Sequence, residues 1–227
     1  MLDPFSIKRF SKIDPRRVTF TLAARLQERA SRAQFDRYAL PLSDEGDLTS
    51  APTTAIEDTD VDQRQMDVLA RHFSALQAAL PGDCVEIGAF RGVTTAKMAE
   101  LAPARTVFAV DPFMGYGGSD VDLAKFQART GTIANIVHVR KPSGSALADL
   151  AGKTISFIFI DAVHDYVNVR FDGRSWLSLL RPGGLIAFHD VDEPCFAGTR
   201  RAVAEIAREA DLVAHVPGLI ILRKRAV

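Results

Sequence analysis

Two pairs of ionisable residues follow apolar runs of the sequence. Asp161 comes directly after such a run, with His164 three residues further on, and His189 and Asp190 follow another. Carboxylates and imidazoles together can bind a divalent cation or move a proton near neutral pH. A polar residue is expected at the end of any buried strand, so each of them taken alone can be structural. Two such ends, each carrying both Asp and His, favour a functional site.

A third motif is Glu86-x-Gly88-x-x-x-Gly92, which ends an apolar run and is followed at once by a helical pattern. Gly88 is expected to turn the chain with a positive φ, and Gly92 to let the helix start lie close to a ligand. A later apolar run ends in Asp111. In an open α/β sheet this is where a carboxylate can hydrogen-bond a ribose diol. The glycine motif and Asp111 together therefore predict a ligand with a ribose at the strand ends.

The glycine spacing differs from the G-x-G-x-x-G of dinucleotide folds, and Glu86 would repel a pyrophosphate but can orient a cationic ligand. Together with Asp111, the motif resembles that of class I S-adenosylmethionine-dependent methyltransferases. The resemblance implies that the methionine part of the cofactor lies against Glu86, Gly88, Ala89 and Gly92, and that the ribose lies on Asp111.

In the family that this sequence resembles, the loop after the third strand borders the adenine. Residues 143–145 are candidates for that contact, Ser143 first among them. Ser145 can equally be a helix N-cap without any contact to a cofactor. Both interpretations of this loop stay open.

The segments F-I-D-A-V-H-D-Y and R-P-G-G-L-I-A-F-H-D-V resemble the metal-dependent O-methyltransferases of sugars and natural products, of the macrocin, mycinamicin and cephalosporin-biosynthesis type. The resemblance covers about residues 83–207. It implies that Asp161, which also borders the cofactor, and an acidic pair after the next strand hold Mg²⁺. It also implies that His164 serves as the base.

This sequence departs from the acidic pair, because His189 replaces its first member while Asp190 remains. Mg²⁺ prefers oxygen ligands, whereas an imidazole suits Mn²⁺, Fe²⁺ or Zn²⁺ better. The candidate metal ligands are thus Asp161, Asp190 and His189. Either His189 is not a ligand, or the metal differs from Mg²⁺, or the site holds no metal.

The elements that position these residues alternate between strand and helix along the chain. We expect a Rossmann-like, doubly wound α/β sheet of seven strands, mostly parallel, with a C-terminal antiparallel hairpin. Expected strands begin near Cys84 and span residues 106–110, 135–139, 155–160, 185–188, 212–216 and 219–222. Expected helices span residues 61–73, 95–101, 121–130, 167–180 and 199–210.

Residues 1–60 are expected to form an N-terminal helical extension and a lid, and residues 61–227 the S-adenosylmethionine-binding domain. Val18, Leu22 and Leu26 recur at helical spacing among many basic residues. We expect this helix to pack on the main domain or on a sister subunit with its charges solvated, which leaves a homo-oligomer open. Contact with a membrane surface is disfavoured because the apolar face is thin. The irregular segment 41–54 is the predicted lid.

Composition limits the partners. Lys+Arg and Asp+Glu both total 28, so no net field favours nucleic acid. The two cysteines suggest no disulfide framework, no apolar run approaches a membrane span of ~20 residues, and the start lacks a signal-peptide core. These features favour a cytoplasmic protein.

The sequence therefore predicts an S-adenosylmethionine-dependent O-methyltransferase that acts on a hydroxyl of a sugar or a small natural product. A divalent cation, Mg²⁺ or Mn²⁺, would assist, and His164 would take the proton. Two alternatives remain: a non-catalytic binding protein on the same fold, and an NAD-dependent oxidoreductase, for which the pyrophosphate motif is lacking.

Overall fold

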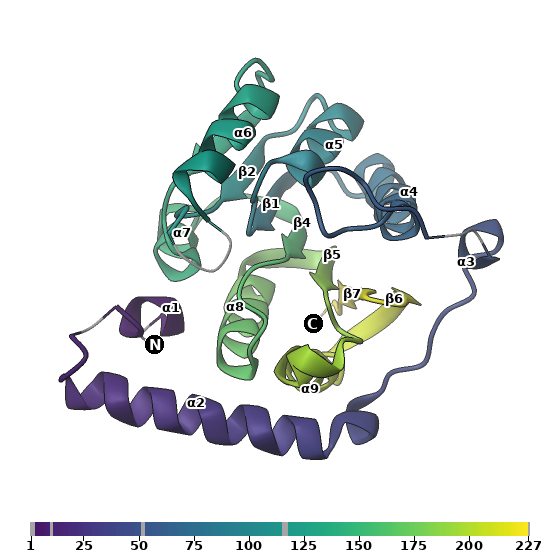
Figure 1. Ribbon diagram of the computed structural model, residues 1–227. Helices are drawn as coiled ribbons and strands as arrows, with labels where there is room; N and C mark the ends of the chain where they lie inside the picture. The colour runs from purple at the N-terminus through teal and green to yellow at the C-terminus, as the bar shows by residue number, and fades with distance from the viewer. Residues whose placement is uncertain (1–2, 10, 51–52, 115–117, 227) are drawn as a thin grey trace.

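A computed structural model describes residues 3–9, 11–50, 53–114 and 118–226. Its centre is one seven-stranded sheet with the order β3-β2-β1-β4-β5-β7-β6 (Figure 1). The strands from β3 to β5 pair in parallel, and β7 pairs antiparallel with both β5 and β6. The predicted fold class is confirmed. Within the described residues, no helix is both long enough and apolar enough to span a membrane.

The strands lie close to their predicted positions because β1, β2 and β4 are short apolar runs that are buried on both faces, while the edge strand β3 is only partly buried. Their bounds are β1 Asp83–Ile87, β2 Val107–Val110, β3 Ile136–Val139, β4 Ile155–Ile160, β5 Leu180–His189, β6 Ala210–Val216 and β7 Leu219–Lys224. The last parallel strand begins earlier than the predicted residues 185–188, so that residues 181–184 fall inside β5. The pairing register with β4 shifts there.

Helices cover both faces of the sheet. On one side pack α4 (Gln63–Ala79), α5 (Val93–Leu101) and α6 (Asp120–Thr130); on the other pack α7 (Ser143–Asp149), α8 (Tyr166–Leu179) and α9 (Ala197–Ile206). Side chains of β1 alternate between the two cores: Cys84 joins Phe73 of α4, while Val85 joins Trp176 of α8. Because both faces of the strand are covered by apolar cores, polar groups gather at the strand ends.

The N-terminal segment contains α1 (Pro4–Ile7), α2 (Pro15–Ala33), the 3₁₀ helix η1 (Phe35–Tyr38) and α3 (Asp47–Ser50). Helix α2 contacts α8 and α9 and runs across their outer side (Figure 1). Glu28 accepts a hydrogen bond of 2.8 Å from the backbone N–H of Gly198, and Arg201 donates one of 2.8 Å to Gln27. The polar face of α2 therefore makes its contacts with the domain.

This packing corrects the expected orientation of α2. Val18, Leu22 and Leu26 are 56%, 60% and 58% exposed, so the apolar stripe faces outward instead of packing on the main domain. The hydrogen bonds of Gln27 and Glu28 to α9 fix the opposite face inward. The homo-oligomer stays a prediction.

The predicted lid at residues 41–54 is also corrected. In its described part, Ser43 hydrogen-bonds β6 through the backbone of His215, and buried Glu45 binds Arg71 and His72 of α4. None of the described residues of this segment lines the main cavity, which instead receives Phe5 and residues 58–60 from the N-terminal segment. The domain boundary at residue 60 stays a prediction. In the glycine-rich segment that follows β2, residues 115–117 lie outside the described residues.

Candidate active site

A cavity of about 520 Å³ opens at the carboxyl ends of β1, β2, β4 and β5, where doubly wound sheets bind ligands. Most predicted site residues line it: Glu86, Gly88, Ala89, Asp111, Ser143, Asp161, His164 and Asp190. Gly92 and His189 do not. The predicted site residues are thus brought to one place, with two exceptions that the local geometry explains.

Gly88 sits at the turn after β1 with a φ of +91°. A Cβ at this position would lie 1.9 Å from the backbone oxygen of Asp161. The absence of a side chain is therefore needed for the close approach of two strand ends, and not only for the turn. This contact positions Asp161 against the glycine turn.

Gly92 has a different role from the predicted one. It is the N-cap of α5 with a φ of +77°, and a Cβ there would lie 2.8 Å from the side chain of Thr130 and 3.0 Å from that of Phe126. Its missing side chain makes room for α6, which packs behind the turn. The expectation that Gly92 lets the helix approach a ligand is thus corrected.

Glu86 is 2% exposed and lies at the inner end of the cavity, where the hydroxyl of Thr95 donates a hydrogen bond to it. Burial raises the pKa of Glu86 well above its usual value, and the Thr95 hydrogen bond offsets only part of this rise. A cationic group placed beside it would favour the ionised form. Glu86 is therefore suited to a positively charged ligand.

Asp111 ends β2 and accepts hydrogen bonds from the backbone N–H groups of Phe90, at 3.0 Å, and Phe113, at 2.7 Å. Burial raises its pKa, although these amides oppose the rise. Each oxygen accepts one amide and keeps a second lone pair. The carboxylate is thus fixed in place and can still accept from a diol.

Ser143 begins α7, and its hydroxyl donates a hydrogen bond to buried Asp172 of α8. Burial raises the pKa of Asp172 to about 7 despite this bond. Ser145 does not cap the helix, because Pro142 occupies the N-cap position and no side chain caps it there. Of the two open interpretations for this loop, the N-cap is therefore wrong.

Asp161, His164, His189 and Asp190 form a tight cluster, and one ligand atom from each lies within 4.8 Å of the others. Nε2 of His164 is 3.2 Å from Asp161 and 3.4 Å from Asp190. Nδ1 of His189 is 3.3 Å from Asp161 and 3.4 Å from Asp190. Asp190 has a φ of +56°, an uncommon conformation for a residue with a side chain, and such strain gathers at functional sites.

The tautomer of His189 follows from its neighbour Gln65. The amide nitrogen of Gln65 donates to the backbone of Pro217, and its oxygen accepts from the N–H of Asp62, which fixes the orientation of the amide. Nε2 of His189, 3.0 Å from that oxygen, must therefore donate to it. Nδ1, buried and without a hydrogen-bond partner among the described residues, is left facing two carboxylates. It must either carry a proton or bind a cation.

Charges in the cluster depend on one another. Burial by itself would raise the pKa of Asp161, but the charge of His189 and the hydrogen bond of His164 hold it well below its usual value. Burial would lower the pKa of His189, yet Asp161 and Asp190 raise it to about 9. Burial raises the pKa of Asp190, opposed by both histidines. Two carboxylates this close repel each other unless a positive charge lies between them or one of them takes up a proton.

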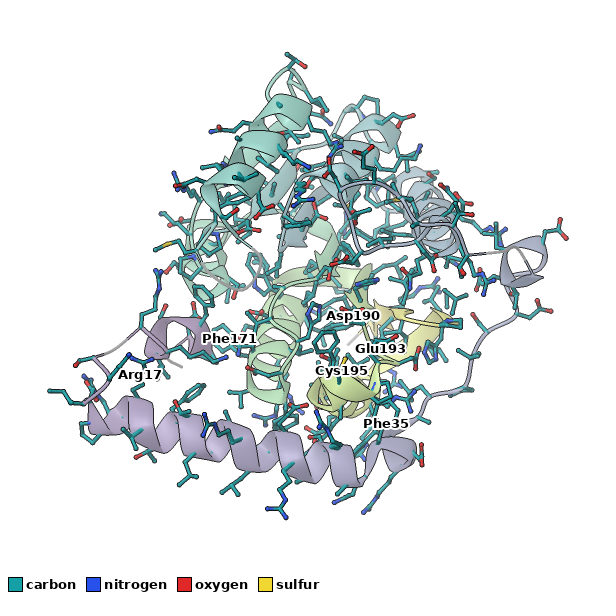
Figure 2. The ribbon with its side chains drawn as sticks, in the orientation of Figure 1. Arg17, Phe35, Phe171, Asp190, Glu193 and Cys195 are labelled. Atoms are coloured by element: carbon teal, nitrogen blue, oxygen red, sulfur yellow. The ribbon has the colours of Figure 1, made fainter. Side chains whose placement is uncertain are left out.

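The two histidines differ in exposure. The side chain of His189 is 2% exposed and lies behind the carboxylates, whereas His164 is 20% exposed, lines the cavity and stacks on Phe196 with ring centroids 4.7 Å apart. Figure 2 shows Asp190, Glu193 and Cys195 along the segment that joins β5 to α9. A substrate in the cavity can therefore reach His164.

Asp192 belongs to the structure and not to the site. It accepts hydrogen bonds from His215 at 3.0 Å, from the backbone of Gly218 at 2.9 Å and from Arg200 at 2.7 Å. It thereby ties the segment after β5 to β6 and β7. Glu193, next along the chain, does line the cavity.

Sequence reasoning missed several cavity residues. Residues 58–60 lie over the turn after β1 because Asp58 binds Arg91 at 2.9 Å and Lys125 at 2.5 Å. Nothing in the local pattern of this segment signals these contacts. Gln65, which contacts His189 and does not line the cavity, was also missed. Its place at a helix start could have been found from the sequence, because Asp62-x-x-Gln65 is a helix capping box.

Comparison with known proteins places these features in context. Residues 85–191 match the family model described as a methyltransferase domain. No curated protein matches the chain. Solved structures with this fold include cofactor-bound Rv0187 from MTB, which is 21% identical, has a TM-score of 0.57 and aligns over 99% of this chain and 96% of its own.

Two other similar structures are the calicheamicin methyltransferase CalS11 and the O-methyltransferase NovP. CalS11 is 15% identical, with a TM-score of 0.55 and coverage of 96% of each chain. NovP is 14% identical, with a TM-score of 0.56 and coverage of 91% of this chain and 99% of its own. Likeness at these identities establishes the fold alone.

Proposed function

We propose, from the premise that residues 85–191 are a methyltransferase domain on the class I fold, that the protein methylates a hydroxyl of a sugar or small natural product. The family match and the shared fold support the sequence prediction of a class I S-adenosylmethionine-dependent methyltransferase. The observation that carries the proposal is the Asp161–His164–His189–Asp190 cluster, which lies beside the cavity that contains Glu86 and Asp111.

S-adenosylmethionine is the proposed cofactor. Its ammonium and sulfonium charges suit the inner part of the cavity, where burial disfavours the ionised form of Glu86 unless a cation is near. Its ribose would hydrogen-bond Asp111, whose carboxylate is already oriented by two backbone amides. The adenine would lie against the start of α7 at Ser143.

A divalent cation is proposed between Asp161, Asp190 and Nδ1 of His189. The buried Nδ1 without a hydrogen-bond partner supports a ligand role, since its lone pair is directed at the carboxylates. One nitrogen and two carboxylate donors suit Mn²⁺ or Fe²⁺ better than Mg²⁺. When bound, such a cation would orient the acceptor hydroxyl and lower its pKa.

The protein's own part in the reaction is alignment and proton removal. The acceptor oxygen would form a bond to the methyl carbon as the bond from that carbon to sulfur breaks, and the hydroxyl proton would pass to His164. Nε2 of His164 donates to the carboxylate of Asp161, so the neutral ring keeps its lone pair on Nδ1, which would take the proton. Asp161 and Asp190, 3.2 and 3.4 Å from Nε2, would stabilise the imidazolium that results. Phe196 holds the ring in place by stacking.

A metal-free version of the site is the second candidate. Asp161 and Asp190 raise the pKa of His189 to about 9, so a protonated His189 could itself neutralise the two carboxylates. In that case His164 would act without a cation. The non-catalytic binding protein and the NAD-dependent oxidoreductase are kept as outcomes of the test.

The test is a transfer assay with methyl-labelled S-adenosylmethionine over a panel of sugars and phenols, before and after exhaustive chelation. We expect transfer to a hydroxyl, loss after chelation, and recovery with Mn²⁺. Full activity in a metal-free sample would establish the acid–base site instead. Cofactor binding without transfer to any acceptor would indicate a binding protein, and binding of NAD in its place would overturn the proposal.

A further inference from the structure

A second cavity, of about 600 Å³, lies beside the first. It is bounded by α1, α2, the start of α8 and the loop after β2, and Phe5 lines both cavities. We call it the basic cavity. Its ionisable residues are Lys8, Arg9, Arg17, Arg25, Glu28 and Asp165.

Four cations and two carboxylates leave two positive charges in excess in the basic cavity. Both carboxylates are already engaged. Asp165 caps α8 by accepting from the backbone N–H of Asn168 at 2.9 Å and pairs with Lys8 at 2.8 Å. Glu28 accepts from the backbone N–H groups of Gly198 at 2.8 Å and Tyr166 at 3.4 Å. The arginines therefore give the basic cavity its excess of positive charge.

The arginines come from two walls. Arg17 and Arg25 project from one face of α2, eight residues and so about 12 Å apart. Figure 2 shows Arg17 on the side of α2 nearer to α1. Arg9 enters from the end of α1, where its guanidinium lies 5.6 Å from the centre of the Phe5 ring and 3.2 Å from the sulfur of Met114. A ligand between the walls would meet guanidinium groups on both sides.

We propose that the basic cavity binds a phosphate or diphosphate group of the methyl acceptor, so that the acceptor is a phosphorylated sugar or small molecule. A phosphate monoester carries close to two negative charges at neutral pH, which equals the excess in the cavity. Planar guanidinium groups bind phosphate oxygens in pairs. The acceptor would pass Phe5, with its hydroxyl at His164 and its phosphate between α1 and α2. This inference rests on the proposed function.

Arg29 provides a matched control. It follows Arg25 by one helical turn on α2 and is exposed, but it does not line the basic cavity. A general attraction of anions to the basic helix would depend on both arginines alike. A built site would depend on Arg25 and not on Arg29.

The first experiment is a calorimetric titration of the full chain with inorganic pyrophosphate, with sulfate and acetate as the other anions. We expect saturable pyrophosphate binding, weaker for sulfate and weaker still for acetate. Arg9→Gln and Arg25→Gln should each weaken pyrophosphate binding about 10-fold, the scale of one charge-assisted hydrogen bond, and Arg29→Gln less than twofold. No saturable binding, or an equal loss in Arg29→Gln, would overturn the proposal.

The second experiment tests the link to the acceptor. Initial rates are measured with a phosphorylated acceptor and its dephosphorylated counterpart, for the wild type and for Arg25→Gln. The KM for the phosphorylated compound should rise about 10-fold in the variant and not in Arg29→Gln. Equal KM values for the two compounds in the wild type would overturn the acceptor role while methyl transfer stands. If no hydroxyl compound is methylated, the proposed function fails, and the titration alone decides whether the basic cavity is an anion site.

Discussion

At the scale of single residues, the two histidines of the cluster contact the same carboxylates but differ in what else they can do. His189 is enclosed and donates its other nitrogen to Gln65, so it can only hold a proton or a cation between Asp161 and Asp190. His164 faces the cavity. A proton from a substrate can therefore reach His164 and not His189, which supports the proposed roles of His164 as the base and of His189 as a positioning residue.

Replacing the proposed base tests this division of roles. His164→Ala should lower kcat by roughly 10²–10⁴, the range for loss of a general base, while the affinity for S-adenosylmethionine and the bound metal stay the same. Rates, calorimetry and metal analysis of the purified variant check this. His72→Ala, which removes an imidazole of α4 that binds Glu45, serves as the control. A near wild-type rate would exclude His164 as the base, and loss of the metal would make it a ligand.

Asp192 gives a prediction for acid stability. Burial would raise its pKa, but His215, Gly218 and Arg200 lower it to about 2. Because the folded pKa lies below the value of 3.8, the resulting stabilisation is complete above pH ~4 and is lost as the pH falls through about 2. Asp192→Asn should therefore cost about 1–2 kcal/mol at pH 7. Urea unfolding at several pH values should show that difference shrinking below pH 4; a difference independent of pH would contradict it.

At the scale of elements, the site depends on how closely two strand ends approach. The turn after β1 contacts the end of β4 through Gly88 and the backbone oxygen of Asp161. The glycine turn and the strand end that carries Asp161 are therefore joined by one backbone contact. A shift in the turn moves Asp161 with it.

Two glycines with the same φ of +91° separate backbone strain from steric clash. A Cβ at Gly152 would meet nothing within 4 Å, so Gly152→Ala should cost only the left-handed conformation, ~1–2 kcal/mol. Gly88→Ala should cost several kcal/mol more, because its Cβ would lie 1.9 Å from the oxygen of Asp161. Urea unfolding and cofactor titration measure both effects. Equal losses in the two variants would show that the clash is relieved without cost.

The sequence predicted those elements whose residues carry their own signal. Strands β1, β2 and β4 are short apolar runs, and the residues that follow them had to meet at one edge of the sheet. The orientation of α2 could not be predicted in this way, because the hydrogen bonds of Gln27 and Glu28 to α9 outweigh the apolar stripe. The partnership of His189 with Gln65 spans 124 residues and depends on tertiary packing.

At the scale of the whole molecule, the N-terminal segment completes the site. Asp3 accepts from the backbone of Gly144 at 3.3 Å, and Lys8 pairs with Asp165 at 2.8 Å, so α1 is held against α7 and α8. Phe5 then separates the two cavities. A segment without any catalytic motif thus forms part of the wall of the cavity that contains His164.

Binding of the cofactor should stabilise the entire fold, because its proposed contacts join β1, β2 and α7. A ligand at 100 times its Kd adds about 2.7 kcal/mol, which for a chain of this size raises Tm by roughly 5–10 °C. Asp111→Ala removes a hydrogen bond to the ribose worth ~1.5–3 kcal/mol. At the same concentration of S-adenosylmethionine, the ligand-induced rise in the variant should fall to roughly half or less.

Differential scanning calorimetry with and without S-adenosylmethionine measures this rise for each protein against its own ligand-free Tm. That reference is needed because Asp111 also accepts hydrogen bonds from Phe90 and Phe113, so its removal lowers the ligand-free Tm as well. Asp120→Ala, at an exposed residue that does not line the cavity, should keep the full rise. An unchanged rise in Tm in Asp111→Ala would show that the ribose binds elsewhere. The methyl group would then approach the cluster from a different direction.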